Sequence, residues 1–221
     1  YEWKYALSSL EQILEHSIWI NKIDVYMKMS RKPYQLTLAV KHGLCIPNTV
    51  VSNKCEDILN LFDHGEVIYK TLSSFCTPEK VIYTNKVTKN QILDGRSSIE
   101  LAPGIFQNYI DKLYELRVTI INDKVFIYKV NSQEKKSTKT DWRYQQDPRM
   151  FSSGKLSDDV TQKLLNFHRD AKLKFATYDF IVDTEGKEIF LECNPSGQWL
   201  LSNPDISTQI SKEMALYLSA N

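Results

Sequence analysis

Two carboxylates and one amide near the end of the sequence have a spacing that could hold a metal ion. Glu192 and Asn194 lie two residues apart in a predicted strand, so their side chains should share a face, whereas Phe190 and Cys193 should not. Asp179 lies on the preceding strand of the same predicted hairpin and can face them. Two carboxylates and an amide oxygen form a hard-oxygen set suited to Mg²⁺. The pattern therefore predicts a magnesium site with positions left for phosphates and water.

The alternative is an ordinary solvated sheet face with unrelated charged residues. The neighbours Ile189, Phe190 and Leu191 are apolar, and a strand without a site would be expected to continue with Val or Ile. This context favours the metal site. Short patterns of this kind also arise by chance, so spacing alone leaves both interpretations open.

The strands that position these side chains follow from alternating hydrophobicity. Residues 177–182 and 188–193 form the hairpin that carries the carboxylates. An earlier hairpin is predicted from 115–121 and 124–130, with Asn122-Asp123 as a two-residue turn that suits positive φ. Two such hairpins indicate a mostly antiparallel sheet.

The remaining elements are less sharply marked. Asn53 and Glu56 have the spacing of a capping box at a helix start. Residues 131–155 are polar and predict a mobile loop. The predicted helices lie within 1–22, 31–42, 54–64, 158–172 and 206–219, and the further strands are 45–51, 67–72, 80–85 and 105–110.

This order of elements predicts an α+β fold and argues against a doubly wound parallel sheet. Lys and Arg number 28 against 27 Asp and Glu, so non-specific nucleic-acid binding by bulk charge is not expected. Apolar runs stay shorter than the ~20 residues that a membrane helix needs, and no signal-peptide pattern is recognised. Four scattered cysteines without a CxxC pair are typical of reduced thiols, so a cytoplasmic location is expected.

Beyond spacing, Asp179 together with Leu191-Glu192-x-Asn194 resembles the terminal metal motif of ATP-grasp enzymes. The continuation, 194–199 with the sequence NPSGQW, resembles the NPxGQW signature of ATP-grasp ribosomal peptide maturases, the microviridin-type or graspetide ligases. Further segments similar to this family follow one another in the same order: Trp19-Ile20-Asn21, Lys32-x-x-Gln35-Leu36, Gly43-Leu44-x-Ile46-Pro47-x-Thr49, Phe106-Gln107, Glu115-Leu116-Arg117-Val118 and Asp141-Trp142-Arg143.

The resemblance implies an ATP-grasp fold, in which two α+β subdomains clasp ATP, with Mg²⁺ held by Asp179, Glu192 and Asn194. Lys70 is implied to reach the α-phosphate, and Lys32 is implied to be a second phosphate lysine. For both lysines the alternative is an outward, solvated side chain. For the adenine hinge, whose residues are named next, the alternative is a plain buried strand. The implied adenine and ribose contacts are the hinge residues Gln107, Asn108, Tyr109 and Ile110, Leu191 against the base, and Glu115 on the ribose hydroxyls.

Two arginines are assigned to the reacting phosphates because a guanidinium can bind phosphate or carboxylate in a bidentate way. Arg117 and Arg143 would contact the γ-phosphate and an acyl phosphate. For Arg117 the alternative is an ion pair with Glu115 or Asp111. The implied reaction activates Asp or Glu side chains of a ribosomal precursor peptide as acyl phosphates, which a hydroxyl or amine then attacks to form a macrolactone or macrolactam.

The implied partner is that precursor peptide, with its leader and core, and a homodimer is also considered; no nucleic acid or membrane partner is expected. Residues 1–22 are expected to be a remnant of an N-terminal pre-ATP-grasp region, 23–110 the central subdomain and 111–221 the C-terminal subdomain. Two alternatives stay open: an ATP-grasp ligase that adds amino acids to another acceptor, and a truncated fragment that only binds nucleotide or leader peptide. A neighbouring short reading frame rich in Thr, Ser, Lys and acidic residues would favour the macrocyclase.

Overall fold

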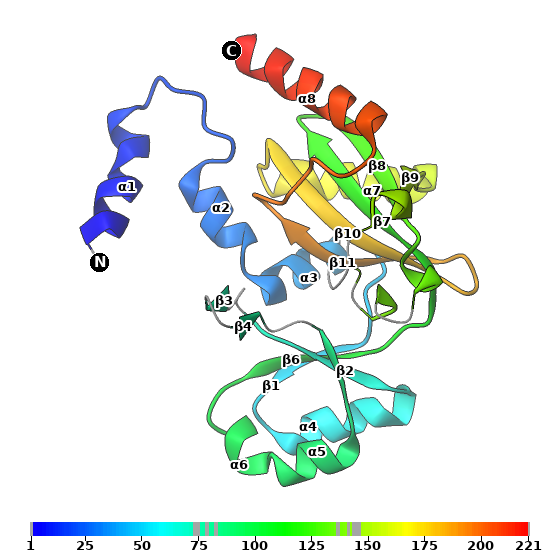
Figure 1. The fold of residues 1–221 in the computed structure, drawn as a ribbon. Coiled ribbons are helices and arrows are strands. Elements are labelled where there is room, and N and C mark those ends of the chain that lie inside the picture. The colour runs from blue at the N-terminus through cyan, green and yellow to red at the C-terminus, as the bar shows by residue number, and fades with distance from the viewer. Residues whose placement is uncertain are drawn as a thin grey trace.

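The computed structural model describes residues 2–72, 76–77, 80–81, 84–135, 138–140, 142 and 147–220. The strands form a five-stranded sheet, a four-stranded sheet and a small two-stranded hairpin. Figure 1 shows the two larger sheets in separate lobes, with helices packed on each. Every strand pairing in the described residues is antiparallel, so the predicted α+β class is confirmed.

The larger sheet carries both predicted hairpins. Its strand order is β11-β10-β7-β8-β9. At the turn between β7 and β8 Asn122 has a φ of 53°, as the turn prediction requires, and Asp123 is not among the residues with positive φ. The strands are β7 (Lys112–Ile121), β8 (Lys124–Val130), β9 (Phe151–Ser153), β10 (Phe175–Asp183) and β11 (Glu188–Asn194).

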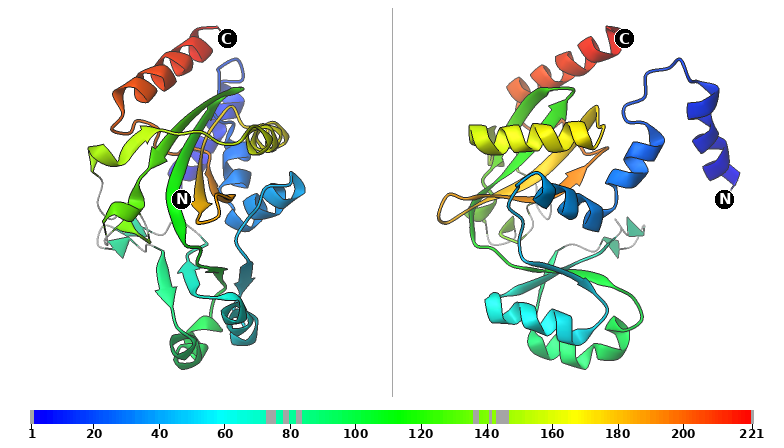
Figure 2. Two further views of the ribbon diagram at one scale, coloured as in Figure 1. Left: turned by 90° about the vertical axis from the view of Figure 1, so that its right-hand side faces the viewer. Right: turned by 180° about the vertical axis from the view of Figure 1, so that it is seen from behind.

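Alternation along the strands gives this sheet two different faces. On one face Val118, Tyr178 and Phe180 pack in a core beneath α3 (Lys32–Lys41) and α7 (Asp158–Asp170). On the opposite face the last helix, α8 (Pro204–Ser219), covers one end of the sheet through Ile206 and Ile210. Figure 2 shows the sheet edge-on, with α3 and α7 on one side and α8 on the other.

The smaller sheet has the strand order β1-β6-β2-β5. One core joins its strands to the helices of this lobe, with Cys55, Ile58, Ile92 and Phe106 buried in it. The elements are β1 (Thr49–Ser52), β2 (Val67–Lys70), β5 (Asn85–Val87), β6 (Gly104–Asn108), α4 (Cys55–Leu59), η1 (Asn60–His64), α5 (Lys89–Asp94) and α6 (Arg96–Ile99). The small hairpin β3 (Cys76–Thr77) and β4 (Lys80–Val81) extends from β2 toward the larger lobe.

Residues 109–111 connect β6 of the smaller sheet directly to β7 of the larger sheet. The chain therefore passes from one lobe to the other next to the predicted division between 110 and 111, which stays a prediction. At the N-terminus α1 (Glu2–Ile13) stands apart from the sheets, and α2 (Ile23–Met29) leads into α3. No helix among the described residues is long and apolar enough to cross a membrane.

The predicted capping box at Asn53 is wrong. The helix begins at Cys55 after Lys54 without a side-chain cap, and the Asn53 amide instead donates to the carbonyl of Glu100, 3.0 Å away. A true capping box occurs at Thr88 and Gln91, at the start of α5. Asn53 is used to join two segments of the small lobe, which a local sequence pattern cannot reveal.

Short regular elements occur among the described residues of the loop predicted over 131–155, among them η2 (Ser132–Glu134), η5 (Pro148–Met150) and β9. Lys135 Nζ lies 2.8 Å from Asp147 Oδ2, and this ion pair joins the two ends of the segment between them. Part of this loop and part of the predicted strand 80–85 lie outside the described residues.

Candidate nucleotide and metal site

One row of residues across the larger sheet carries the charged side chains that the sequence singled out. Glu192 on β11 is paired with Asp179 on β10, Asp179 with Arg117 on β7, and Arg117 with Tyr128 on β8. Because residues paired across strands share a face, two carboxylates and a guanidinium lie side by side. This polar row lies on the sheet face opposite α3 and α7.

The two carboxylates converge on the Asn194 side chain. Its Nδ2 lies 3.1 Å from Asp179 Oδ2 and 3.3 Å from Glu192 Oε1. The Asn194 amide thus lies between two carboxylates. Such a position favours a cation that binds oxygen ligands, and the amide oxygen can be one of those ligands. Among the described residues there is no cluster of three or more His, Cys, Asp or Glu for a metal. Two carboxylates completed by an amide oxygen form a set of hard-oxygen ligands that fits Mg²⁺.

Arg117 is buried beside this set. Its Nη1 donates to both oxygens of Asp179 at 2.8 Å, and its Nη2 donates to the carbonyl of Gln198 at 2.9 Å. The Nε atom is buried and has no hydrogen-bond partner among the described residues. The pairing suggested as an alternative for Arg117, with Glu115 or Asp111, is not what the structure shows, because Asp179 takes that place.

A β-bulge corrects one expectation about β11. Asp179 is paired with Glu192 and the next residue, Phe180, with Phe190, so Leu191 is an extra residue in the strand. As a result Phe190 and Cys193 are both buried in the core beneath α3 and α7, although strict alternation would put them on opposite faces. Leu191 is only partly buried and belongs to none of the apolar cores.

The turn after Asn194 folds back over the polar row. Gly197 N donates to the carbonyl of Asn194 at 3.1 Å. A Cβ at Gly197 would lie 1.8 Å from Thr177 Oγ1 and 2.9 Å from Arg117 Nη2, so only glycine allows this close approach. The glycine of the NPSGQW segment is therefore explained by packing against the row.

Asn21, in the N-terminal segment, also binds this turn. Its Nδ2 donates to the carbonyls of Phe175 and Pro195 at 2.7 and 2.8 Å. Its Oδ1 accepts from the backbone N–H groups of Lys174 and Phe175. All four bonds of one buried amide thus join the N-terminal segment to the start of β10 and to the turn.

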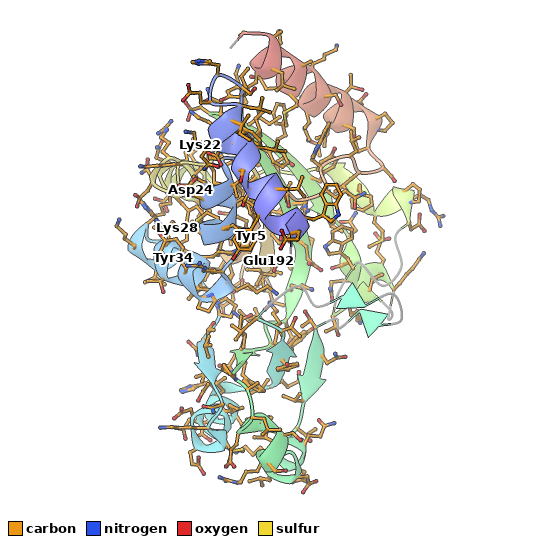
Figure 3. All side chains as sticks on the ribbon, turned by 90° about the vertical axis from the view of Figure 1, so that its left-hand side faces the viewer. Tyr5, Lys22, Asp24, Lys28, Tyr34 and Glu192 are labelled. Atoms are coloured by element: carbon orange, nitrogen blue, oxygen red, sulfur yellow. The ribbon has the colours of Figure 1, made fainter. Side chains whose placement is uncertain are left out.

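The two predicted phosphate lysines lie at the edge between the lobes. Lys32 Nζ is 3.8 Å from Glu192 Oε2 and donates to the carbonyl of Thr71 at 3.1 Å. Lys70 ends β2 and is paired with Ile105. Glu192 lies toward the end of the large sheet that faces the small lobe, as Figure 3 shows. Lys32 is therefore placed beside the metal set, and contact of either lysine with phosphate stays a proposal.

The predicted hinge residues divide into two kinds. Gln107 and Asn108 are buried in β6, and their amides donate to Thr49 Oγ1 and to the Leu61 carbonyl at 2.9 and 2.8 Å. Tyr109 and Ile110 lie in the link between the lobes. Tyr109 N donates to the carbonyl of Glu66 at 2.7 Å, and Lys86 Nζ lies 3.7 Å from the Tyr109 ring centre. The first pair holds the small lobe together, and the second pair lies where the chain crosses between the lobes, with Tyr109 N bonded to Glu66.

Glu115 lies two residues before Arg117 in β7 and therefore shares its sheet face, but it is buried. Lys112 Nζ lies 2.7 Å from Glu115 Oε1 and 3.5 Å from the carbonyl of Thr140. Burial raises the pKa of Glu115, against the opposing effects of Lys112 and Ser132. The Lys112–Glu115 pair thus joins the start of β7 to the loop after β8, and the contact of Glu115 with ribose stays a proposal.

Arg143 and Asp141 lie outside the described residues. Their neighbour Trp142 is 7% exposed and packs edge-on against Phe151, with ring centres 5.6 Å apart. This ring fixes the middle of the Asp-Trp-Arg segment to the core next to β9.

The comparison with protein families decides the identity of this fold. A model of the RimK-like ATP-grasp domain matches residues 30–218, a range that includes every predicted site residue. The chain belongs to the RimK-like ATP-grasp family. The ATP-grasp fold and ligase family predicted from the sequence are thus confirmed, and ATP with Mg²⁺ is the cofactor pair of this family. No curated protein matches the chain.

Solved structures of ATP-grasp ligases are similar over most of the chain. One is a Chryseobacterium gregarium RiPP-associated ATP-grasp ligase in complex with ADP and a leader and core peptide, 27% identical over 91% of this chain and 62% of that chain, with a TM-score of 0.81. The macrocyclase MdnC from Microcystis aeruginosa, bound with precursor peptide MdnA, is 30% identical over 91% and 64%, with a TM-score of 0.78. The macrocyclase MdnB from the same organism is 27% identical over 97% and 67%, with a TM-score of 0.78. The chain therefore spans about two thirds of their length.

Three residues at or near the candidate site had no role assigned from the sequence. Asn21 and Gln35 occur in segments that resemble the family, and each amide bonds backbone atoms near the metal set. Lys112 was not singled out. The available signal for Gln35 was an amide at the inner position of an amphipathic helix, next to Leu36. No local pattern pointed to the Lys112–Glu115 pair.

Proposed function

We propose that this chain is the nucleotide-binding catalytic part of a ligase that uses ATP to join side chains of a ribosomal precursor peptide. Asp or Glu side chains of the peptide are activated as acyl phosphates. A hydroxyl or amine side chain of the same peptide then closes a macrolactone or macrolactam. The row of Glu192, Asp179 and Arg117, with Asn194 between the two carboxylates, is the observation that carries this proposal.

The support for the peptide substrate comes from relatives. MdnC, 30% identical, is named a macrocyclase and was solved with its precursor peptide, and the Chryseobacterium ligase was solved with a leader and core peptide. Both are longer than this chain. A peptide partner for this chain is therefore proposed by similarity, and a homodimer stays a prediction.

The proposed chemistry transfers the γ-phosphoryl group of ATP to a carboxylate oxygen and leaves ADP. The nucleophile then attacks the acyl carbon, loses its proton and displaces phosphate. When bound to Asp179, Glu192 and Asn194, Mg²⁺ supplies positive charge at the β- and γ-phosphates. Arg117 orients Asp179 through its two 2.8 Å hydrogen bonds. Its buried charge also stabilises negative charge that develops next to the row.

The remaining roles are proposed from the resemblance to the family. Lys32, beside Glu192, and Lys70, at the end of β2, are proposed to bind the phosphates. The crossing at Tyr109 and Ile110 is proposed to hold adenine through backbone groups, and Leu191 to pack on the base. Glu115 is proposed as the ribose acceptor, and Arg143 as the acyl-phosphate arginine.

The test is a reaction with ATP, Mg²⁺ and synthetic peptides that carry Thr, Ser or Lys together with Asp or Glu, including MdnA. Mass spectrometry should find the loss of one water per ring, and added hydroxylamine should trap the activated carboxylates as hydroxamates. ADP formation that responds to free amino acids and not to any peptide would support a ligase for another acceptor. Nucleotide binding without ADP formation under any of these conditions would support a binding fragment.

A further inference from the structure

β11, which carries the metal motif, is an edge strand of the larger sheet. An edge strand has outward backbone N–H and C=O groups without a strand partner. Here α3 lies along that edge and supplies partners from a side chain. The motif Glu192-Cys193-Asn194 is therefore held on one side by β10 and on the other by this helix.

Gln35 binds both outward groups of Cys193. Its Oε1 accepts from Cys193 N at 2.9 Å, and its Nε2 donates to Cys193 O at 2.7 Å. The same Nε2 donates to the carbonyl of Met29, which ends α2. Gln35 is 3% exposed. A single buried amide thus replaces a missing strand at the residue between two proposed metal ligands.

A second contact on this edge lies three residues earlier. Phe190 N donates to the carbonyl of Cys45 at 2.8 Å. In a regular strand the groups on one edge recur every second residue, so a spacing of three needs one extra residue between the contacts. Leu191 is that residue, because the bulge lies between Phe190 and Glu192. The contacts at Phe190 and Cys193 therefore fix the bulge from both ends.

We propose that Gln35 is a positioning residue of the metal site, which fixes the bulge that turns Leu191 and Glu192 together toward the nucleotide. This inference rests on the proposed function, because it assumes that Glu192 binds Mg²⁺. Glutamine suits the task because one side chain must accept from an N–H and donate to two carbonyls. Without it, the strand can return to regular alternation, which would move Leu191 or Glu192 out of place.

The test compares Gln35→Met with Leu164→Ala. Met has a similar volume and no amide, whereas Leu164 is a fully buried residue of α7 in the same core and makes no hydrogen bond to β11. Calorimetry gives the affinity for ADP with and without Mg²⁺. Outer partners of metal ligands typically contribute a factor of about 10–100 to metal affinity. Gln35→Met should reduce the Mg²⁺-dependent gain by about tenfold or more, while Leu164→Ala lowers the melting temperature and keeps that gain.

Equal Mg²⁺ dependence in the two variants would overturn the positioning role. If Gln35→Met does not fold, Gln35→Asn, which keeps the amide and shortens its reach, is measured in the same way. If the wild-type chain itself shows no Mg²⁺ dependence, the proposed function fails, and amide hydrogen exchange still tests the bulge. Gln35→Met should then lose protection at Cys193 and Phe190 relative to Leu164→Ala, and unchanged protection would overturn the inference.

Discussion

Arg117 and Asp179 form a largely buried ion pair, in which one terminal nitrogen of the guanidinium lies 2.8 Å from both carboxylate oxygens. The other terminal nitrogen binds the carbonyl of Gln198. This relationship joins the centre of the larger sheet to the turn that follows the metal motif. It also explains why arginine, with its fixed fork of donors, occupies this position.

Arg117→Lys should destabilise the fold, because a single ammonium cannot span Asp179 and the Gln198 carbonyl. Hydrogen bonds to charged groups contribute up to about 3 kcal/mol, so the free energy of unfolding in urea should fall by about 2 kcal/mol. Arg169→Lys is the control, since its partner Asp123 is about half exposed and such pairs contribute about 1 kcal/mol or less. Similar losses of unfolding free energy in both variants would show that the Arg117–Asp179 pair contributes no more to stability than an exposed pair.

Gly197→Ala should lower stability and disturb the turn, because the new methyl group would lie 1.8 Å from Thr177 Oγ1. Overpacking of this kind typically costs about 1–3 kcal/mol. Adding Thr177→Ala removes the closest atom and should recover part of the loss in thermal unfolding. If the double variant loses as much stability as the sum of the two single-variant losses, the clash is not the cause.

His168 should make stability depend on pH. It is buried against Tyr178, with Nδ1 2.6 Å from the hydroxyl, and burial lowers its pKa from 6.5 to about 4. The folded state therefore binds fewer protons than the unfolded state in this window. Its contribution is fully present above pH 6.5 and is lost as the pH falls toward 4, in total about 3 kcal/mol.

The measurement for His168 is chemical unfolding between pH 7 and pH 4. His168→Phe should remove most of that loss, whereas His16→Gln, at a side chain that is 97% exposed, should leave it unchanged. An unchanged pH profile in His168→Phe would assign the acid sensitivity to other groups.

Lys112→Met should leave Glu115 buried without its ion-pair partner. Breaking a buried pair typically costs about 3–5 kcal/mol. Burial already raises the pKa of Glu115 and Lys112 opposes this, so the folded variant will hold a proton that the unfolded chain loses. Its stability should therefore fall as the pH rises above the ordinary value of 4.5.

The double variant Lys112→Met with Glu115→Gln should regain stability above that pH, as urea unfolding at several pH values can measure. Lys86→Met, from a pair with Glu66 that is largely exposed, is the matched control and should change stability by about 1 kcal/mol or less. A double variant no more stable than Lys112→Met would contradict the role given to the buried pair.

The sequence predicted what depends on local pattern. Both hairpins of the larger sheet, the helix over 158–172 and the convergence of Asp179, Glu192 and Asn194 follow from alternation and spacing, and the structure has them. The family followed from a set of short segments in a fixed order. These features need few long-range contacts to be recognised.

What the sequence could not predict depends on partners distant in the chain. The bulge at Leu191 is fixed by Gln35 and Cys45, which lie far earlier in the sequence. Asn53 was expected to cap a helix, and it binds Glu100 instead. Arg117 was expected to contact a phosphate, or alternatively to pair with Glu115 or Asp111, and its carboxylate partner is Asp179, 62 residues away. In each case a long-range contact determines a local structure for which the local sequence shows no clear preference.

Binding of ATP with and without Mg²⁺ by calorimetry, on this chain and on Glu192→Gln, tests the central claim most directly. Glu185→Gln, in the exposed turn of the same hairpin, is the control. The account predicts that the wild-type chain and the control bind ATP more tightly with Mg²⁺, and that Glu192→Gln loses this Mg²⁺-dependent part. Nucleotide affinity that is absent, or unaffected by Mg²⁺ and by Glu192→Gln, would contradict it.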